Sequence, residues 1–146
     1  MGCRVVEVLA FVVPGKPLGK GRPRFTRAGG GRAFTPAKTV NAESMIALFA
    51  SQAMGGQAPF GQGEPLTCRV VAVFDVPASW PKRKRASAYA GTTWPTGKPD
   101  GDNLAKMVGD ALNGVAWHDD SQVVEWTVRK QYGAAAELRV EVTALA

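Results

Sequence analysis

The segment from Leu104 to Leu112 carries the most regular pattern in the chain. Its apolar residues recur at intervals of three and four, so they form one stripe along an α-helix. The stripe consists of Leu104, Met107, Val108, Ala111 and Leu112. Gly114, just past the segment, suits the left-handed conformation that commonly ends a helix. The pattern predicts an amphipathic helix whose apolar side covers another layer of structure.

Other apolar segments predict that this second layer is a β-sheet. Residues 4–13 and residues 67–76 form apolar runs typical of strands, and the nearly continuous second run predicts a central strand. Residues 123–130 and 137–144 alternate between apolar and polar side chains. With the small residues between them, these two segments predict an antiparallel hairpin.

A second helix is expected over residues 37–54, because Pro36 stands at its start and Gly55 just past its end. Residues 77–99 are expected to form a long loop. The resulting order β-α-β-α-β-β predicts an α/β (α+β) fold in which a mixed sheet packs against two helices. The length of 146 residues predicts a single domain spanning residues 1–146.

The cysteine count and the hydropathy pattern favour a cytoplasmic protein. The two cysteines, Cys3 and Cys68, are too few for a disulfide framework, so free thiols are expected. The longest apolar run, residues 8–13, is far too short to cross a bilayer, and the N-terminal residues lack the pattern of a secretory signal. We therefore expect no membrane partner.

Basic residues are concentrated in two segments of a chain whose formal net charge is +6. Residues 16–38 hold seven cations and no acid, and residues 82–85 read KRKR. A solubilising surface would mix both signs, so these segments favour a polyanion such as nucleic acid over an anionic membrane surface. The candidate DNA-binding residues are Lys16, Lys20, Arg22, Arg24, Arg27, Lys82, Arg83, Lys84 and Arg85. Phe25, Trp80 and Trp94 lie in or beside these segments and suit either stacking on unpaired bases or burial under a loop.

Acidic residues gather in a short span of this basic chain. Five of the twelve acids fall within 21 residues: Asp100, Asp102, Asp110, Asp119 and Asp120. Each alone has a structural interpretation, as a helix cap, as an i, i+4 partner of Lys106 or as part of a polar turn. Together they repel one another unless a cation neutralises them. The pairs at the two ends of the predicted helix converge only if the next strand runs back beside the helix start.

The residue types around these acids favour Mg²⁺ over other metals. Mg²⁺ takes one or two carboxylates together with water and substrate phosphate. Leu104 at the fifth position excludes an EF-hand calcium loop, and a single histidine, His118, serves a zinc site poorly. Carboxylates and Mg²⁺ beside polyanion-binding segments indicate phosphodiester chemistry, in which Lys106 stabilises charge on the phosphorane oxygens.

The acidic segment resembles a known family. Residues 98–124, KPDGDNLAKMVGDALNGVAWHDDSQVV, are similar to the signature of the RusA family of Holliday junction resolvases: D-x-D-N-x-x-K, then D-A-L, then W-x-D-D-x-Q-V. The segments GKPLGKGRPRFT, TPAKT and SWPKRKR are similar to the phage and Gram-positive branch of that family. The resemblance therefore covers most of the chain.

This resemblance implies an endodeoxyribonuclease that depends on Mg²⁺, with Mn²⁺ as a substitute. The catalytic positions correspond to Asp100, Asp102, Lys106 and Asp120, of which the three aspartates bind the metal. Supporting roles are expected for Asp110, which would hold Lys106, and for Asp119, which would orient its loop. The family acts as a homodimer that nicks opposed strands of a four-way DNA junction in recombination and repair. A two-fold junction suits a two-fold protein with one site per subunit.

Two other functions stay open from the sequence. One is a junction-binding or DNA-binding module that does not cleave, and the other is a nuclease for other branched DNA. Retention of Lys106 and the three aspartates favours an enzyme, because carboxylates near phosphates weaken simple binding through repulsion.

Overall fold

A four-stranded sheet is the frame of the fold in this computed structural model, which describes residues 8–19, 24–25, 33–34 and 37–145. The elements are β1 (Val8–Pro14), β2 (Arg24–Phe25), β3 (Ala33–Phe34), α1 (Ala37–Met54), β4 (Leu66–Asp75), α2 (Lys82–Tyr89), α3 (Gly101–Leu112), η1 (Asp120–Gln122), β5 (Val123–Gly133) and β6 (Glu137–Ala144). The sheet has the strand order β1-β6-β4-β5, while β2 pairs with β3 in a separate ribbon. Because β4 is antiparallel to β6 and parallel to β5, the sheet is mixed.

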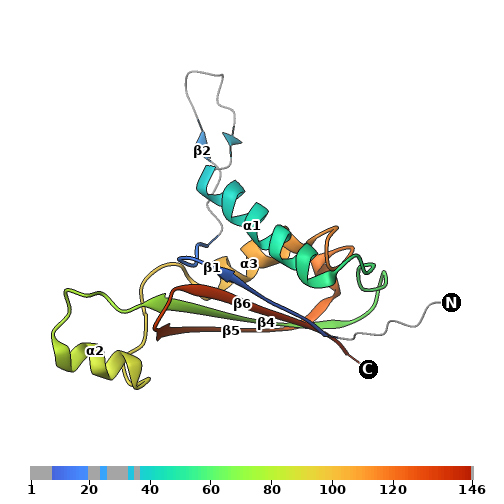
Figure 1. Ribbon diagram of the computed structural model, residues 1–146. Helices are drawn as coiled ribbons and strands as arrows, with labels where there is room; N and C mark the ends of the chain where they lie inside the picture. Colours follow the sequence, from blue (N-terminus) through green and yellow to red (C-terminus); the bar gives the residue numbers. More distant parts are fainter. Residues whose placement is uncertain (1–7, 20–23, 26–32, 35–36, 146) are drawn as a thin grey trace.

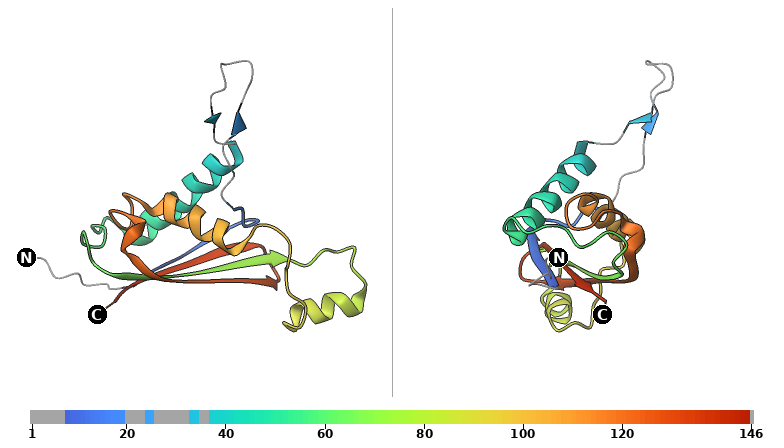
Figure 2. Two further views of the ribbon diagram at one scale, coloured as in Figure 1. Left: turned by 180° about the vertical axis from the view of Figure 1, so that it is seen from behind. Right: turned by 90° about the vertical axis from the view of Figure 1, so that its right-hand side faces the viewer.

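Two helices cover one face of this sheet. α1 and α3 lie side by side on that face (Figure 1). The third helix, α2, lies on the opposite side of the sheet and beyond its end (Figure 2). The α+β class with a mixed sheet is therefore confirmed, whereas the predicted order of elements matches only roughly, because β2, β3 and α2 are additional. No helix in the described part of the chain has the length and hydropathy needed to span a membrane.

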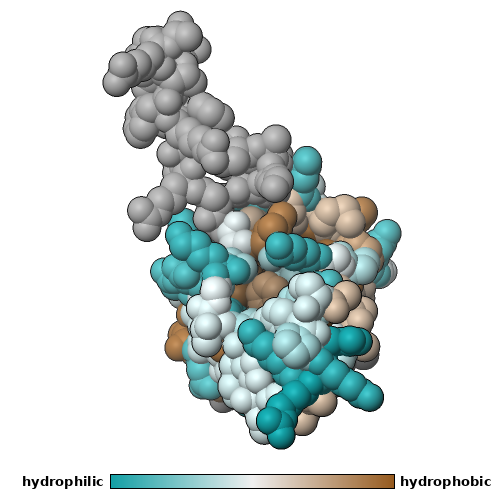
Figure 3. Space-filling view, turned by 90° about the vertical axis from the view of Figure 1, so that its left-hand side faces the viewer, coloured by the Kyte–Doolittle hydropathy of each residue, from teal (hydrophilic) through white to brown (hydrophobic). Residues whose placement is uncertain are grey.

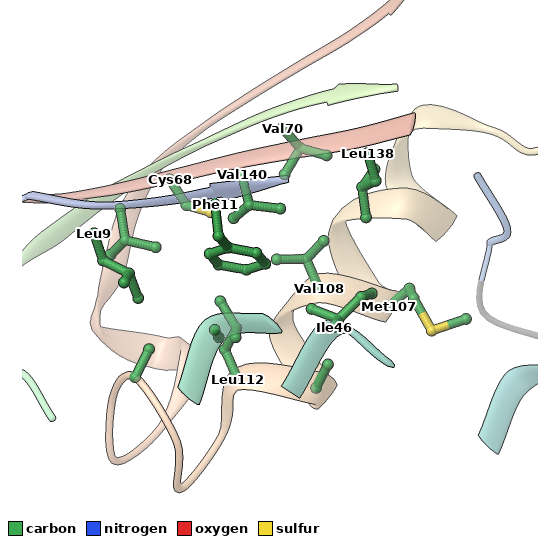
Figure 4. Packing of buried hydrophobic residues seen from close by; sticks show 14 of the residues in the cluster. Leu9, Phe11, Ile46, Cys68, Val70, Met107, Val108, Leu112, Leu138 and Val140 are labelled. Atoms are coloured by element: carbon green, nitrogen blue, oxygen red, sulfur yellow. The ribbon is translucent and has the colours of Figure 1, made fainter. Parts of the chain in front are cut away.

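The hydrophobic core fills the space between the sheet and its two covering helices. Leu9, Phe11 and Val13 of β1 are buried, whereas the residues between them are exposed. Phe11 points from the sheet toward the helices, with Val108 of α3 beside its ring (Figure 4). Burial of each such side chain contributes about 1.5–3 kcal/mol. The core thereby fixes α3, which carries the acidic segment, against the sheet.

Several predicted elements agree closely with the structure. The second predicted strand is β4, which lies between β6 and β5 as its continuous apolar pattern predicts. Helix α1 has the predicted bounds, and Gly55 just past it takes a φ of 58°. Helix α3 extends from Gly101 to Leu112, and Gly114 takes a φ of 76° beyond its end.

The predicted hairpin of the last two strands is wrong. β4 lies between β5 and β6 and pairs with one along each of its edges. Alternating side chains indicate which faces a strand presents and not which strand is its neighbour. The alternating patterns of β5 and β6 are both compatible with pairing to β4. Residues 134–136 therefore carry the chain across the end of β4 instead of forming a hairpin turn.

Gly133 allows this crossing. A Cβ built on Gly133 would lie 2.6 Å from Cγ1 of Val73, closer than non-bonded carbon atoms approach. Val73 lies on β4, where it is 2% exposed, and its branched side chain has little rotamer freedom to move aside. A glycine at the end of β5 thus lets the chain pass closely over the central strand.

The predicted loop over residues 77–99 is wrong over the part that forms α2. The Pro81 carbonyl accepts a hydrogen bond from the Arg85 amide at 3.0 Å, and Gly91 takes a φ of 82° just past the helix. Lysine, arginine and alanine are good helix formers. Local propensity therefore forms a helix here despite four adjacent positive charges.

The N-terminal basic segment contains the short ribbon of β2 and β3, in which Arg24 lies opposite Phe34. In Figure 1 this ribbon lies beyond the first turn of α1. The candidate DNA-binding residues Lys20, Arg22 and Arg27 lie outside the described residues, as do Cys3 and residues 4–7 of the first predicted strand. The structure therefore describes only part of the N-terminal basic segment, and that part includes paired strands.

Cys68 is predicted to be unreactive in the folded protein. It is a free cysteine on β4, 1% exposed, and burial raises the pKa of its thiol from 9.0 to about 12. Because thiolates attack alkylating reagents, Cys68 in a Cys3→Ser background should resist iodoacetamide at about pH 8.5 and react once urea unfolds the chain, as mass spectrometry would show. Because burial disfavours the thiolate, the free energy of unfolding should fall as the pH rises from 9 toward 12. Equal alkylation rates with and without urea would contradict the burial of this thiol.

Candidate active site

The polar side of α3 faces away from the sheet. Its apolar stripe is buried against β4, β5 and α1. Asp102, Lys106 and Asp110 follow one another at intervals of four residues on the other side. The side chain of Lys106 is 64% exposed, and its Nζ lies 3.8 Å from Oδ2 of Asp110, which is 27% exposed. This side of the helix therefore presents a row of alternating charges.

The two aspartates at the start of α3 lack the structural roles that such positions commonly have. Asp100 occupies the N-cap position, yet its side chain accepts no cap hydrogen bond. Asp102 is exposed, and among the described residues it forms no ion pair, with Lys106 or any other cation. The side chain of Asp100 therefore does not cap the helix, and Asp102 does not pair with Lys106. Both carboxylates are available to bind a cation.

The second aspartate pair lies in a turn held by hydrogen bonds. Asp119 caps η1, since its Oδ2 accepts a hydrogen bond from the Ser121 amide at 3.1 Å. Hydrogen bonding by Ser121, through its side chain and then its backbone, lowers the pKa of Asp119 from the ordinary value. Asp119 therefore shapes the turn that presents Asp120.

Gln122 is the buried centre of this turn. Its Oε1 accepts hydrogen bonds from the amides of His118 at 3.0 Å and Asp119 at 3.2 Å. Its Nε2 donates to the carbonyls of Gly61 at 2.8 Å and Glu64 at 3.0 Å. Both ends of a buried amide are thus satisfied. The side chain ties the aspartate turn to the segment that precedes β4.

Asp120 lies against α3 at Gly109. A Cβ on Gly109 would lie 3.0 Å from Oδ2 of Asp120, so the absent side chain gives this carboxylate its place. Gly109 follows Asp102 by seven residues, or nearly two helical turns, so both lie on the same side of the helix. The rise along the helix axis between them is about 10 Å. Asp120 therefore reaches the side of α3 that carries Asp102, two turns further along.

The strand that follows this turn does run back along α3. Val128 of β5 lies 3.7 Å from the Cβ position of Gly101, at the helix start. One side of α3 therefore carries Asp102 near its start and receives Asp120 nearer its end. Within the described residues, no three His, Cys, Asp or Glu side chains stand close enough together to hold a metal ion. Metal binding by Asp100, Asp102 and Asp120 stays a prediction.

The basic helix α2 precedes α3 and is exposed. Lys16, Lys82, Arg83, Lys84 and Arg85 all have exposed side chains. Figure 3 looks at the end of the molecule that carries α2 and shows hydrophilic side chains gathered there. Nζ of Lys84 lies 3.9 Å from the centre of the Trp80 ring, which packs edge-on against Tyr132 at 5.3 Å between ring centres. Trp80 therefore helps to hold α2, whereas Trp94 is 48% exposed and has the guanidinium carbon of Arg129 5.7 Å from its ring centre.

Lys130 is a residue of this region that sequence reasoning missed. The residues of β5 that face the helices alternate up to Val128, so Lys130 shares their side of the sheet. Its Nζ donates hydrogen bonds to the carbonyls of Gly97 and Pro99, the latter at 3.1 Å. These carbonyls lie just ahead of Asp100. A charged residue in an inward-facing register is the sequence signal that points to it.

Comparison with known proteins shows the family to which this chain belongs. Residues 14–143 match the family described as Endodeoxyribonuclease RusA. The chain belongs to the RusA family. It is also similar to a protein of Bacillus subtilis (strain 168) described as uncharacterized protein YqaN, with 39% identity over 140 residues, which cover 94% of this chain and 95% of that protein.

As a RusA-family member, the protein is an endodeoxyribonuclease of the Holliday junction resolvase class. RusA-family nucleases depend on a divalent metal and act on branched DNA. The start of α3 fits such a metal, because Asp100 makes no cap hydrogen bond and Asp102 is exposed. Carboxylate oxygens are the ligands that hard divalent cations take.

Proposed function

We propose that this RusA-family protein is a Mg²⁺-dependent, structure-selective endonuclease that resolves four-way DNA junctions by paired symmetric nicks in recombination and repair. The observation that carries the proposal is the outward side of α3. Asp102 and Lys106 stand there in one row, and Asp120 lies against Gly109 further along. The exposed cations of α2 support the proposal, since they offer a surface for a polyanion.

The residues proposed to hold the metal are Asp100, Asp102 and Asp120, with Mg²⁺ as the resident ion and Mn²⁺ as a substitute. When bound, the ion neutralises charge at the scissile phosphate and activates water for in-line attack. The exposed ammonium group of Lys106 stabilises negative charge that builds on the phosphate oxygens during the reaction. Asp110, 3.8 Å from that ammonium group, orients it, and Asp119 keeps the shape of its turn.

We further propose that the protein acts in the cytoplasm as a homodimer of single-domain subunits, each comprising residues 1–146. A four-way junction in its open form has two-fold symmetry. A dimer with one site per subunit therefore places one nick on each of two opposed strands. Symmetric nicks divide the junction into two duplexes whose ends can be rejoined.

Nicking of a mobile four-way junction, compared with linear duplex of the same sequence, tests the proposed function. In Mg²⁺ we expect paired nicks in the junction only, and none after chelation. Tight junction binding without cleavage in Mg²⁺ or Mn²⁺ would leave a DNA-binding module. Faster cleavage of flaps or forks than of the four-way junction would instead indicate a nuclease for other branched DNA.

Replacing the four α2 cations by Gln is predicted to lower the salt dependence of junction binding. Each phosphate contact contributes about 0.9 to the slope of log K against log salt concentration. Successive residues are turned by about 100° around a helix, so roughly half of four adjacent side chains face one duplex. The expected loss is therefore about two units of slope.

Fluorescence anisotropy at several KCl concentrations, with the metal chelated, measures this slope. Arg139→Gln is the matched control, because it removes a cation from β6 that pairs with Glu137 at 2.7 Å and belongs to neither basic segment. That variant should keep the native slope. An unchanged slope in the α2 variant would remove α2 from the DNA interface.

A further inference from the structure

Lys130 connects an edge strand of the sheet to the backbone that enters the acidic helix. β5 forms one edge of the sheet, and Lys130 lies half-buried on the face that the helices cover. Burying an ammonium group is costly unless acceptors replace its water. The carbonyls of Gly97 and Pro99 supply two such acceptors. The side chain thus has defined partners on another segment.

The same backbone is held from another side by Gly19. A Cβ on Gly19 would lie 2.8 Å from Cβ of Pro99 and 3.0 Å from Cβ of Asn103. Close packing of this kind leaves the segment little room to shift toward Gly19. Residues 99–103 therefore lie between the N-terminal segment and β5, to which Lys130 binds them.

The start of α3 is consequently held by its backbone and not by its own acids. Asp100 is the N-cap residue, yet its carboxylate makes no cap hydrogen bond. Its position follows from the Pro99 carbonyl, which Lys130 holds at 3.1 Å, and the first helical hydrogen bond joins the Leu104 amide to the Asp100 carbonyl at 3.0 Å. This arrangement fixes the direction of the chain and leaves the carboxylate free.

We propose that Lys130 is a positioning residue of the nuclease reaction. It acts through the carbonyls of Gly97 and Pro99 and sets the direction in which Asp100 and Asp102 present their carboxylates. The inference rests on the proposed function, in which these aspartates bind the metal. Misplacement of a reacting group by about 1 Å can lower a rate about a hundredfold, so a residue that only orients ligands can have a large effect.

Two variants of Lys130 test this inference. Lys130→Met keeps the length of the side chain but has no donor, and Lys130→Gln keeps a donor on a shorter chain. We expect Lys130→Met to lower the single-turnover nicking rate of saturated junction about 10- to 100-fold, and Lys130→Gln to cause a smaller loss. The junction Kd, measured with the metal chelated, should stay within about twofold, because the proposed role is not in DNA binding. Arg139→Met, which removes the same charge from β6, a strand that β4 separates from β5, should nick at the native rate.

Hydrogen exchange of the free protein gives a second measurement that needs no activity. Peptides covering residues 97–106 should exchange faster in Lys130→Met, with β1, β4 and β6 unchanged. Unchanged exchange in these peptides, or native nicking rates in both variants, would overturn the inference. A weaker Kd with a lower salt slope and a native saturated rate would overturn it too, because Lys130 would then contact phosphate directly. If the native protein failed to nick any branched DNA, the proposed function would fail, while exchange would still decide whether Lys130 holds the start of α3.

Discussion

Asp102→Asn is expected to lower junction nicking by about 10²- to 10³-fold, the range found when a single electrostatic contact to the transition state is removed. Asn keeps the size of the side chain and one oxygen but removes the negative charge that favours a divalent cation. Asp102 is exposed on the first turn of α3 and caps nothing, so the fold should be unaffected. Junction binding without metal should tighten a few-fold, because one charge that repels phosphate is lost.

Gel assays of single-turnover nicking in saturating Mg²⁺ measure this effect, with a thermal melt to verify folding. Glu141→Gln is the matched control, because it neutralises an exposed acid on β6 and should change the rate by less than twofold. A native rate in Asp102→Asn would remove this residue from the metal site. Loss of rate with equal loss of junction affinity would instead indicate a role in binding.

Gln122→Ala is expected to lower the free energy of unfolding by about 2–4 kcal/mol, because it leaves buried amide and carbonyl groups without partners. Four hydrogen bonds converge on this side chain, and two of them join the aspartate turn to Gly61 and Glu64. Nicking should fall as well, since the turn that presents Asp120 loses its anchor. Urea denaturation measures the change in stability.

Gln122→Glu removes the amide donor and keeps the shape of the side chain, so it tests the two effects separately. An ionised carboxylate would place oxygen against the Gly61 and Glu64 carbonyls, which disfavours the charged form and raises the pKa of the new carboxyl group. Its destabilisation relative to the native protein should therefore shrink as the pH falls and the carboxyl group becomes a donor. Gln62→Ala, an exposed neighbour, should change stability by less than about 0.5 kcal/mol. Native stability in Gln122→Ala would show that water replaces the amide without cost.

Local signals predicted the helices on the covered face of the sheet. Gly55 follows helix α1 and Gly114 follows helix α3, and both glycines have the positive φ expected of helix stops. The apolar stripe of α3 is buried, as its spacing predicts. These features depend on neighbours within a few residues of the sequence. A sequence is informative about them because the same few residues fix both the pattern and the geometry.

Features that depend on distant segments were not predictable in this way. The alternation in β5 and β6 is correct, but it does not reveal that β4 separates them. Gly133 is a local sign that the chain crosses β4 closely, but this role becomes apparent only from its contact with Val73. Similarly, the acidic motif names Asp120 but not its place at Gly109, which follows from the path of β5 back along the helix.

The place of β6 in the sheet also bears on how the protein is made. β6 separates β1 from β4, so β1 pairs with the strand that the ribosome synthesises after the other three strands of this sheet. Val8 lies opposite Thr143, and pairing residues so far apart closes a long loop before contacts compensate for its entropy, which slows folding. The sheet therefore closes only after β6 has been synthesised. A chain truncated before Glu137 retains every acid of α3 but lacks the strand that joins β1 to the rest of the sheet, so we expect no active nuclease before β6 has been synthesised.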